Sequence, residues 1–124
     1  MSKKRPMRLP IFPLPGAILF PRSQLPLHIF EPRYRDMVRD VLDGAGRIGM
    51  IQPKAAEDEG APLYPVGCVG EIVGVEELDD GRYNIILHGW SRFRVVNEAD
   101  MDTAYRNADV DTGEFDDEEP PPLS

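Results

Sequence analysis

The apolar residues follow two different periods on either side of Pro32, and the change of period predicts a strand that leads directly into a helix. From residue 25 to residue 30, large side chains alternate between two faces, as they do in a strand. One face carries Leu25, Leu27 and Ile29, and the other carries His28 and Phe30. Because both faces carry bulk, we expect this strand to be covered on both sides.

After Pro32, the spacing becomes helical, with apolar residues at i, i+3, i+4, i+7 and i+8. These residues are Tyr34, Met37, Val38, Val41 and Leu42. Proline suits the first helical turn, where an N–H has no intrahelical partner, and the charge of Glu31 suits the positive end of the helix. Gly44 is placed to end the helix. The pattern predicts one α-helix at about residues 32–43, docked on a sheet through its apolar stripe.

The rest of the chain predicts strands. They are expected at residues 9–16, where prolines favour an edge position, and at 47–52, 66–78, 83–88, 91–96 and 104–110. Asp79, Asp80 and Gly81 predict a hairpin turn, glycines within 66–78 predict bends or bulges, and Gly89 with Trp90 predicts a break. With no internal repeat and no βαβ alternation, six or seven short strands and one helix predict a mostly β (α+β) domain, a closed or nearly closed antiparallel barrel.

Charge divides the chain into a body and a tail. The net charge of −8 is concentrated after residue 97, where ten acidic residues stand against Arg106 alone. We expect a basic, flexible N-terminus at 1–7, one barrel domain at 8–111, and an acidic, proline-rich tail at 112–124 that is disordered because it has few apolar residues to bury. Residues 53–62 are a second candidate for disorder.

Composition also suggests the compartment. The chain contains one cysteine, Cys68, so no internal disulfide can form. There is neither an apolar run of membrane-spanning length nor a signal-peptide pattern. We therefore expect a cytoplasmic protein that does not enter a membrane.

No set of residues assembles a catalytic or metal site. The soft and imidazole ligands are His28, Cys68 and His88, and no two of them stand at a ligand spacing. Cys68 lies in an apolar strand context, unsuited to a nucleophile, and no glycine loop ends in the Lys-Ser/Thr of a phosphate site. We expect no metal, no cofactor and no enzymatic activity. An enzyme that acts on a small molecule through an unrecognised site is a minor alternative.

Several ordered motifs resemble one family. Residues 9–21 (LPIFPLPGAILFP), 25–34 (LPLHIFEPRY), 46–50 (GRIGM), 66–72 (VGCVGEI), 80–83 (DGRY) and 89–95 (GWSRFRV) look like the amino-terminal, substrate-binding domain of Lon proteases, in the same order. The resemblance implies a PUA-like pseudobarrel that recognises substrate polypeptides. It does not extend to the ATPase and peptidase domains, because the chain holds neither their nucleotide loop nor their peptidase residues. We expect a stand-alone bacterial member or a truncated form.

The resemblance is densest at the strand-to-helix junction, which becomes the candidate peptide-binding surface. Its residues are Phe30, Glu31, Arg33 and Tyr34, with Trp90 as an expected neighbour. The expected partners are unfolded or exposed apolar polypeptide segments, and a weak homodimer is left open. The alternative is an RNA-binding module, because PUA-like barrels also serve that role. Its basic face would be Arg33, Arg35, Arg39, Arg92 and Arg94, which neighbouring aspartates dilute, so nucleic acid is the less favoured partner.

Overall fold

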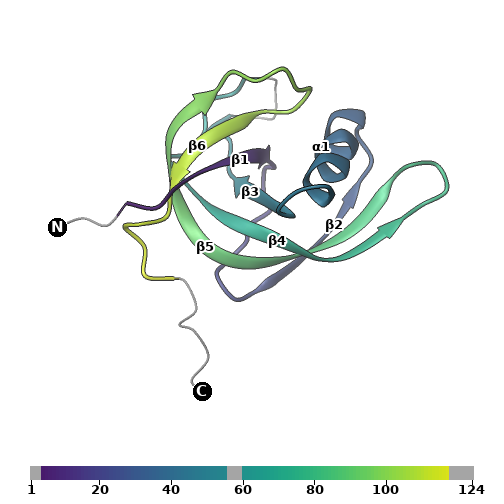
Figure 1. Cartoon of the computed structure of the whole chain (residues 1–124), viewed down its shortest axis with the longest axis horizontal. Helices are drawn as coiled ribbons and strands as arrows, with labels where there is room; N and C mark the ends of the chain where they lie inside the picture. Colours follow the sequence, from purple (N-terminus) through teal and green to yellow (C-terminus); the bar gives the residue numbers. More distant parts are fainter. Residues whose placement is uncertain (1–3, 56–59, 118–124) are drawn as a thin grey trace.

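The structure is a computed structural model that describes residues 4–55 and 60–117 (Figure 1). These residues form six strands and one helix. In chain order, the elements are β1 (Pro6–Pro13), β2 (Gln24–Ile29), α1 (Pro32–Leu42), β3 (Arg47–Ile51), β4 (Val66–Glu77), β5 (Tyr83–Ala99) and β6 (Asn107–Asp111). The predicted mostly β class with one helix is confirmed, and the helix begins at the predicted proline.

The sheet closes on itself through the long strand β5. The strand order is β2-β5-β4-β3-β1-β6, and β6 also pairs with the C-terminal part of β5. The ring therefore runs through β1, β3, β4, β5 and β6, while β2 extends it along the N-terminal part of β5 (Figure 1). Within the described residues, β2 pairs with β5 alone, so its other side is a sheet edge.

The first strand is not at an edge, and the sheet is not purely antiparallel. The first half of β1 pairs antiparallel with β6, and its last three residues pair parallel with β3. The expectation of a purely antiparallel barrel was therefore wrong, and β1 lies between β6 and β3 in the strand order rather than at one end of the sheet. Each half of β1 has one strand partner among the described residues, which leaves a side free for its prolines, since these cannot donate to a ladder.

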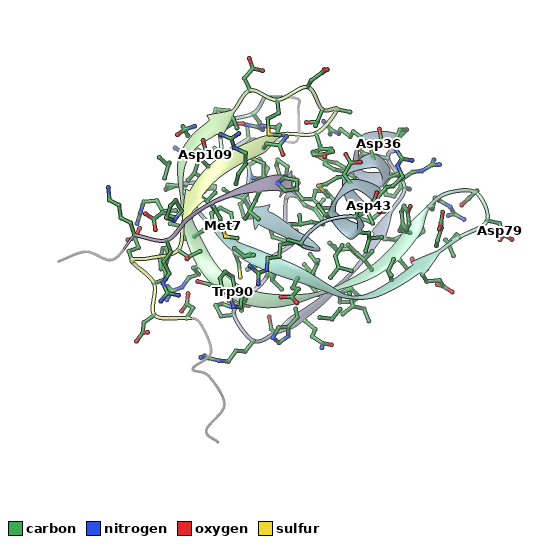
Figure 2. All side chains as sticks on the ribbon, in the orientation of Figure 1. Met7, Asp36, Asp43, Asp79, Trp90 and Asp109 are labelled. Carbon is green, nitrogen blue, oxygen red and sulfur yellow. The ribbon has the colours of Figure 1, made fainter. Side chains whose placement is uncertain are left out.

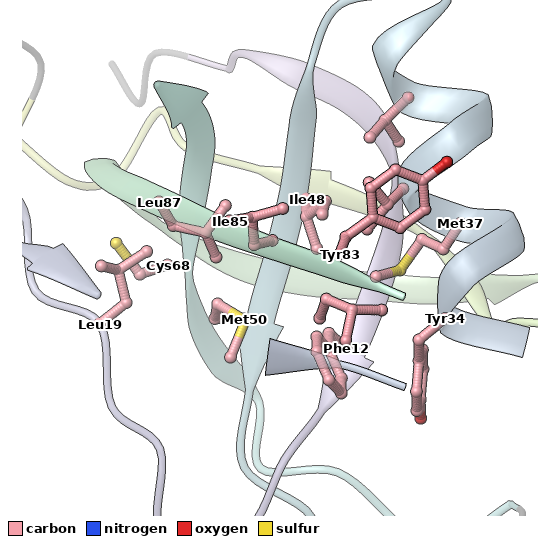
Figure 3. Close-up of a cluster of buried hydrophobic side chains, with 13 residues drawn as sticks. Phe12, Leu19, Tyr34, Met37, Ile48, Met50, Cys68, Tyr83, Ile85 and Leu87 are labelled. Atoms are coloured by element: carbon pink, nitrogen blue, oxygen red, sulfur yellow. The ribbon is translucent and has the colours of Figure 1, made fainter. Parts of the chain in front are cut away.

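The helix packs its apolar stripe into one of two buried clusters. Met37 and Val38 are fully buried and Tyr34 and Val41 nearly so, against core residues that include Phe12, Ile48, Met50 and Tyr83 (Figure 3). Leu42, predicted to belong to the stripe, is 42% exposed, because in the last turn of the helix its position faces away from the core. The left-handed residue that follows the helix is Gly46, with φ 72°, rather than Gly44.

Strand β5 is continuous through the predicted break. It runs without interruption past Gly89 and Trp90, and the interruption is a bulge in its pairing with β4. A side chain at Gly89 would collide with the carbonyl of Phe20, so this glycine serves a close approach of two backbones. A second bulge near Gly74 and a positive φ at Gly81 match the predicted bend and hairpin turn.

The predictions for β2 and for the last strand need correction. The face of β2 that carries Leu25, Leu27 and Ile29 is buried or half-buried, but Pro26 and His28 on the other face are exposed. Within the described residues, the strand is thus covered on one side only. The last strand begins at Asn107, three residues later than predicted, since residues 102–105 form a bend.

Candidate functional site

The β2–α1 junction presents an aromatic side chain to solvent. Ile29 is buried and pairs with Tyr83, and three residues later Pro32 begins α1. Phe30, which lies between the end of the strand and the helix, is 59% exposed. Its ring lies 6.0 Å from that of His28, centroid to centroid. The change from strand to helix therefore leaves a large apolar side chain outside the core.

A small apolar hollow of about 80 Å³ lies beside Phe30. Its walls come from the end of β1, from β2 and from α1: Phe12, Leu14, Leu27, Phe30 and Tyr34. The rings of Phe12 and Tyr34 stack with their centroids 4.2 Å apart, which fixes one wall. The hollow thus lies between the end of β1 and β2, and Tyr34 of α1 closes one side of it.

The charges at the junction neutralise each other. The Arg33 Nε donates to the Glu31 carboxylate at 3.3 Å, and the Arg33 guanidinium lies 4.7 Å from the centre of the Tyr34 ring. Glu31 is the N-cap of α1 but makes no side-chain capping bond. Of the predicted residues, Phe30, Glu31 and Arg33 therefore lie together at the surface of the junction, with a compensated ion pair, whereas Tyr34 is only 6% exposed and packs in the core behind them.

Trp90 belongs to a different part of the molecule. It packs against the second buried cluster, formed around Phe93, and the Arg47 guanidinium lies 4.5 Å from the centre of its ring. Trp90 is seven positions along β5 from Tyr83, the pairing partner of Ile29, which is about 23 Å along an extended strand. Figure 2 shows Trp90 well away from α1, where Asp36 is labelled. The expectation that Trp90 neighbours the junction was wrong.

A polar row crosses the outer face of the neighbouring strands, and it was not predicted. The Asn84 Nδ2 donates to the Glu76 carboxylate at 2.9 Å, the Asn84 Oδ1 lies 2.7 Å from the His28 Nδ1, and Arg82 reaches the other nitrogen of His28. Beside this row, an open groove lined by Pro26, Gly74, Val75 and Ile86 continues from β2 across β5 to β4. The alternating pattern of each strand shows which residues face outward, but only the register across strands shows which of them meet.

The arginines proposed for RNA recognition are engaged with acceptors of the protein itself. The engaged pairs are Arg33 with Glu31, Arg35 with the carbonyl of Asp80, Arg39 with Asp36, Arg92 with Asp117 and Arg94 with Glu114. The first three arginines lie on α1, and the last two lie on β5 near β6. They do not form one basic face of the kind that follows a phosphate backbone.

The cysteine is an inert core residue. Cys68 is buried, and burial raises the pKa of its thiol to about 12, which suppresses the reactive thiolate. Among residues 4–55 and 60–117, no cluster of three or more His, Cys, Asp or Glu side chains is arranged to hold a metal ion. Within the same residues, no helix has both the length and the apolar character needed to cross a membrane.

Together, the closed barrel and the helix that packs into its core define a small, mostly β domain. The chain belongs to the family of the ATP-dependent protease La (LON) substrate-binding domain, whose sequence profile matches residues 8–123. This membership confirms the family expected from the sequence motifs.

Relatives support the same assignment. Lon protease 2 of Myxococcus xanthus is 33% identical over 112 residues, which cover 88% of this chain and 13% of the relative. Lon protease of Desulfosudis oleivorans is 33% identical over 100 residues, covering 77% and 12%. The chain therefore spans about an eighth of the length of these relatives.

Solved structures agree with the fold. The Lon N-terminal domain protein from Xanthomonas campestris superposes with a TM-score of 0.66 at 30% identity, covering 84% of this chain and 58% of that structure. The N-terminal domain of Mycobacterium avium complex Lon protease also gives a TM-score of 0.66, at 14% identity, covering 95% and 57%. The second likeness bears on the fold alone.

Proposed function

We propose that this domain recognises exposed apolar segments of unfolded polypeptides without catalysing a reaction, and that the β2–α1 junction is the binding surface. The observation that carries the proposal is Phe30, which is mostly exposed beside an apolar hollow. Membership in a substrate-binding domain family supports a polypeptide as the partner.

The free side of β2 offers a second element of recognition. An unpaired strand edge can accept an extended chain through backbone hydrogen bonds, with alternate side chains entering neighbouring pockets. Leu27, His28 and Ile29 of β2 line the hollow, so a segment lying along β2 would place one apolar side chain into it. Pro26 lies on the same strand and limits uncontrolled pairing of this edge between copies.

The expected affinity is modest. The hollow accommodates one side chain at most, and full burial of a large apolar side chain contributes about 1.5–3 kcal/mol. Ordering a flexible ligand costs much of what the contacts contribute. We therefore expect dissociation constants in the micromolar range or weaker, with little sequence preference and a weak dependence on salt.

The test is a titration of isotope-labelled protein with reduced, carboxymethylated casein, followed by NMR. The proposal predicts shift changes at residues 27–34 and at the end of β1. Shift changes restricted to the acidic residues after Asp111, or the absence of any at millimolar ligand, would refute it. A parallel titration with single-stranded RNA addresses the alternative, for which shifts at the α1 and β5 arginines would be required.

A further inference from the structure

Along the edge of β5 that faces away from β4, one stretch of the described chain has no strand partner. Along that side, residues 83–88 pair with β2 and residues 94–99 pair with β6. Within the described part of the chain, no strand covers residues 90–93, although β4 continues along the opposite side. Such a gap leaves backbone groups available to a segment that approaches from outside.

The chain's own residues 112–117 occupy this gap. Thr112 is buried and directly follows β6. The Asp117 carboxylate accepts from the backbone N–H of Arg92 at 3.0 Å, and from its Nε and Nη2 at 2.8 and 3.0 Å. A carboxylate thus satisfies a backbone donor that the sheet leaves open, while it also forms a two-pronged pair with the side chain.

Two further contacts hold the same segment against β5. Glu114 pairs with both the Nε and the Nη2 of Arg94. Phe115 lies under the Arg92 guanidinium, 4.9 Å from the ring centre. The segment therefore presents an acid, an aromatic ring and a second acid to two arginines that stand two residues apart on one strand. We call these two arginines and the backbone N–H of Arg92 the Arg92–Arg94 surface.

The occupant is held by contacts that can be exchanged. Arg94 and Glu114 are each about half exposed, and Arg92 is also half exposed although its partner Asp117 is only 12% exposed. Ion pairs with an exposed partner are weak and screened by salt. Fixing a backbone segment costs conformational entropy. A segment held mainly by such pairs and one ring contact is displaceable by another segment with the same chemistry.

We propose that the Arg92–Arg94 surface is a binding site for acidic polypeptide segments that carry an aromatic residue between two carboxylates, and that residues 114–117 fill it in cis. The partner is thus an acidic segment of another polypeptide, which must displace the chain's own segment. This surface is on β5 beside β6, apart from the β2–α1 junction, so the proposal does not depend on the junction's function.

The test uses a fluorescent peptide with the sequence of residues 112–117, Thr-Gly-Glu-Phe-Asp-Asp, and measures its binding to the full chain by polarisation. A tethered competitor acts at an effective concentration of about millimolar. We therefore expect the peptide to bind the double variant Glu114→Gln/Asp117→Asn about fivefold or more tightly than the unaltered chain. Binding should weaken in 0.5 M NaCl, because the Debye length falls to about 4 Å at this salt concentration and the ion pairs are screened.

Matched controls make the result specific. In the double-variant background, Arg92→Gln should abolish binding, whereas Arg39→Gln, which removes another exposed, acid-paired arginine on α1, should leave it unchanged. A peptide with Gln and Asn in place of its acids should not bind. Equal affinities for the double variant and the unaltered chain, or for the Arg92 and Arg39 variants, would overturn the proposal. A concentration-dependent dimer of the unaltered chain that is lost in the double variant would also overturn the proposal. It would mean that residues 114–117 bind the surface of a second copy of the chain.

Discussion

Replacement of Met37 by alanine tests whether α1 anchors the barrel and the junction. The Met37 side chain is completely buried in the cluster that joins α1 to β3 and β5. Truncation of a buried methionine leaves a cavity and costs about 2–5 kcal/mol, a large part of the 5–15 kcal/mol that stabilises a typical domain. At this length, 1 kcal/mol corresponds to about 4 °C in Tm, so we expect a fall of about 8–20 °C.

Thermal unfolding followed by circular dichroism measures this change, and urea unfolding gives the free energy independently. The matched control is Leu42→Ala on the same helix, where the side chain is 42% exposed and the expected loss is below about 1 kcal/mol. If both variants lowered the Tm by the same few degrees, the docking of α1 through its Met37 face would be refuted.

Two further predictions concern Cys68 and the acidic segment. Because burial raises the pKa of the Cys68 thiol to about 12, we expect no labelling by Ellman's reagent at pH 8 until urea unfolds the protein; rapid native labelling would contradict this. The pairing with Arg92 lowers the pKa of Asp117, so its stabilisation is complete above the ordinary carboxyl pKa of about 3.9 and is lost as pH falls through the lowered value. We expect NMR signals of residues 114–117 to become those of a mobile segment only below about pH 4, and release already at pH 5 would argue against the pair.

Local periodicity was sufficient to predict several elements. The helical spacing that begins at Tyr34 and the proline before it predicted α1, since one amphipathic stripe and one start signal act within a dozen residues. The strand expected at residues 83–88 forms the first part of β5. Asp79, Asp80 and Gly81 predicted the hairpin, because the turn requires a residue with positive φ at a fixed place.

Features that depend on contacts distant in sequence were not predictable in the same way. The parallel pairing of β1 with β3 joins residues 38 positions apart, such as Ile11 and Gly49, and no local pattern encodes it. The same limit applies to Trp90, since an aromatic residue after a glycine gives no information on which cluster it joins.

The acidic tail illustrates a different limit. Composition predicted disorder from residue 112, yet residues 112–117 lie against β5 with Thr112 buried. The arginines that hold them, Arg92 and Arg94, were assigned from the sequence to a possible basic face for RNA, because the sequence does not show which acids face them. Residues 118–124 lie outside the described residues, and mobility of the tail in solution stays a prediction.

The domain boundaries are likewise still predictions. Residues 1–3 and 56–59, which cover part of the expected flexible N-terminus and of the polar loop, also lie outside the described residues. For the candidate site, the sequence motifs predicted four residues that the structure brings together at the junction, and they missed the hollow, which β1 completes.

The central claim is that Phe30 at the β2–α1 junction contacts unfolded polypeptides, and the most direct measurement is the affinity of two matched variants for carboxymethylated casein. Phe30→Ser removes the exposed ring at the junction, whereas Val96→Ser removes a similarly exposed apolar side chain, 63% accessible, near the far end of β5. Loss of about 1–2 kcal/mol of apolar contact should weaken binding by the Phe30 variant about 5- to 30-fold and leave the Val96 variant unchanged. Equal affinities for the two variants, with both chains folded, would contradict the account.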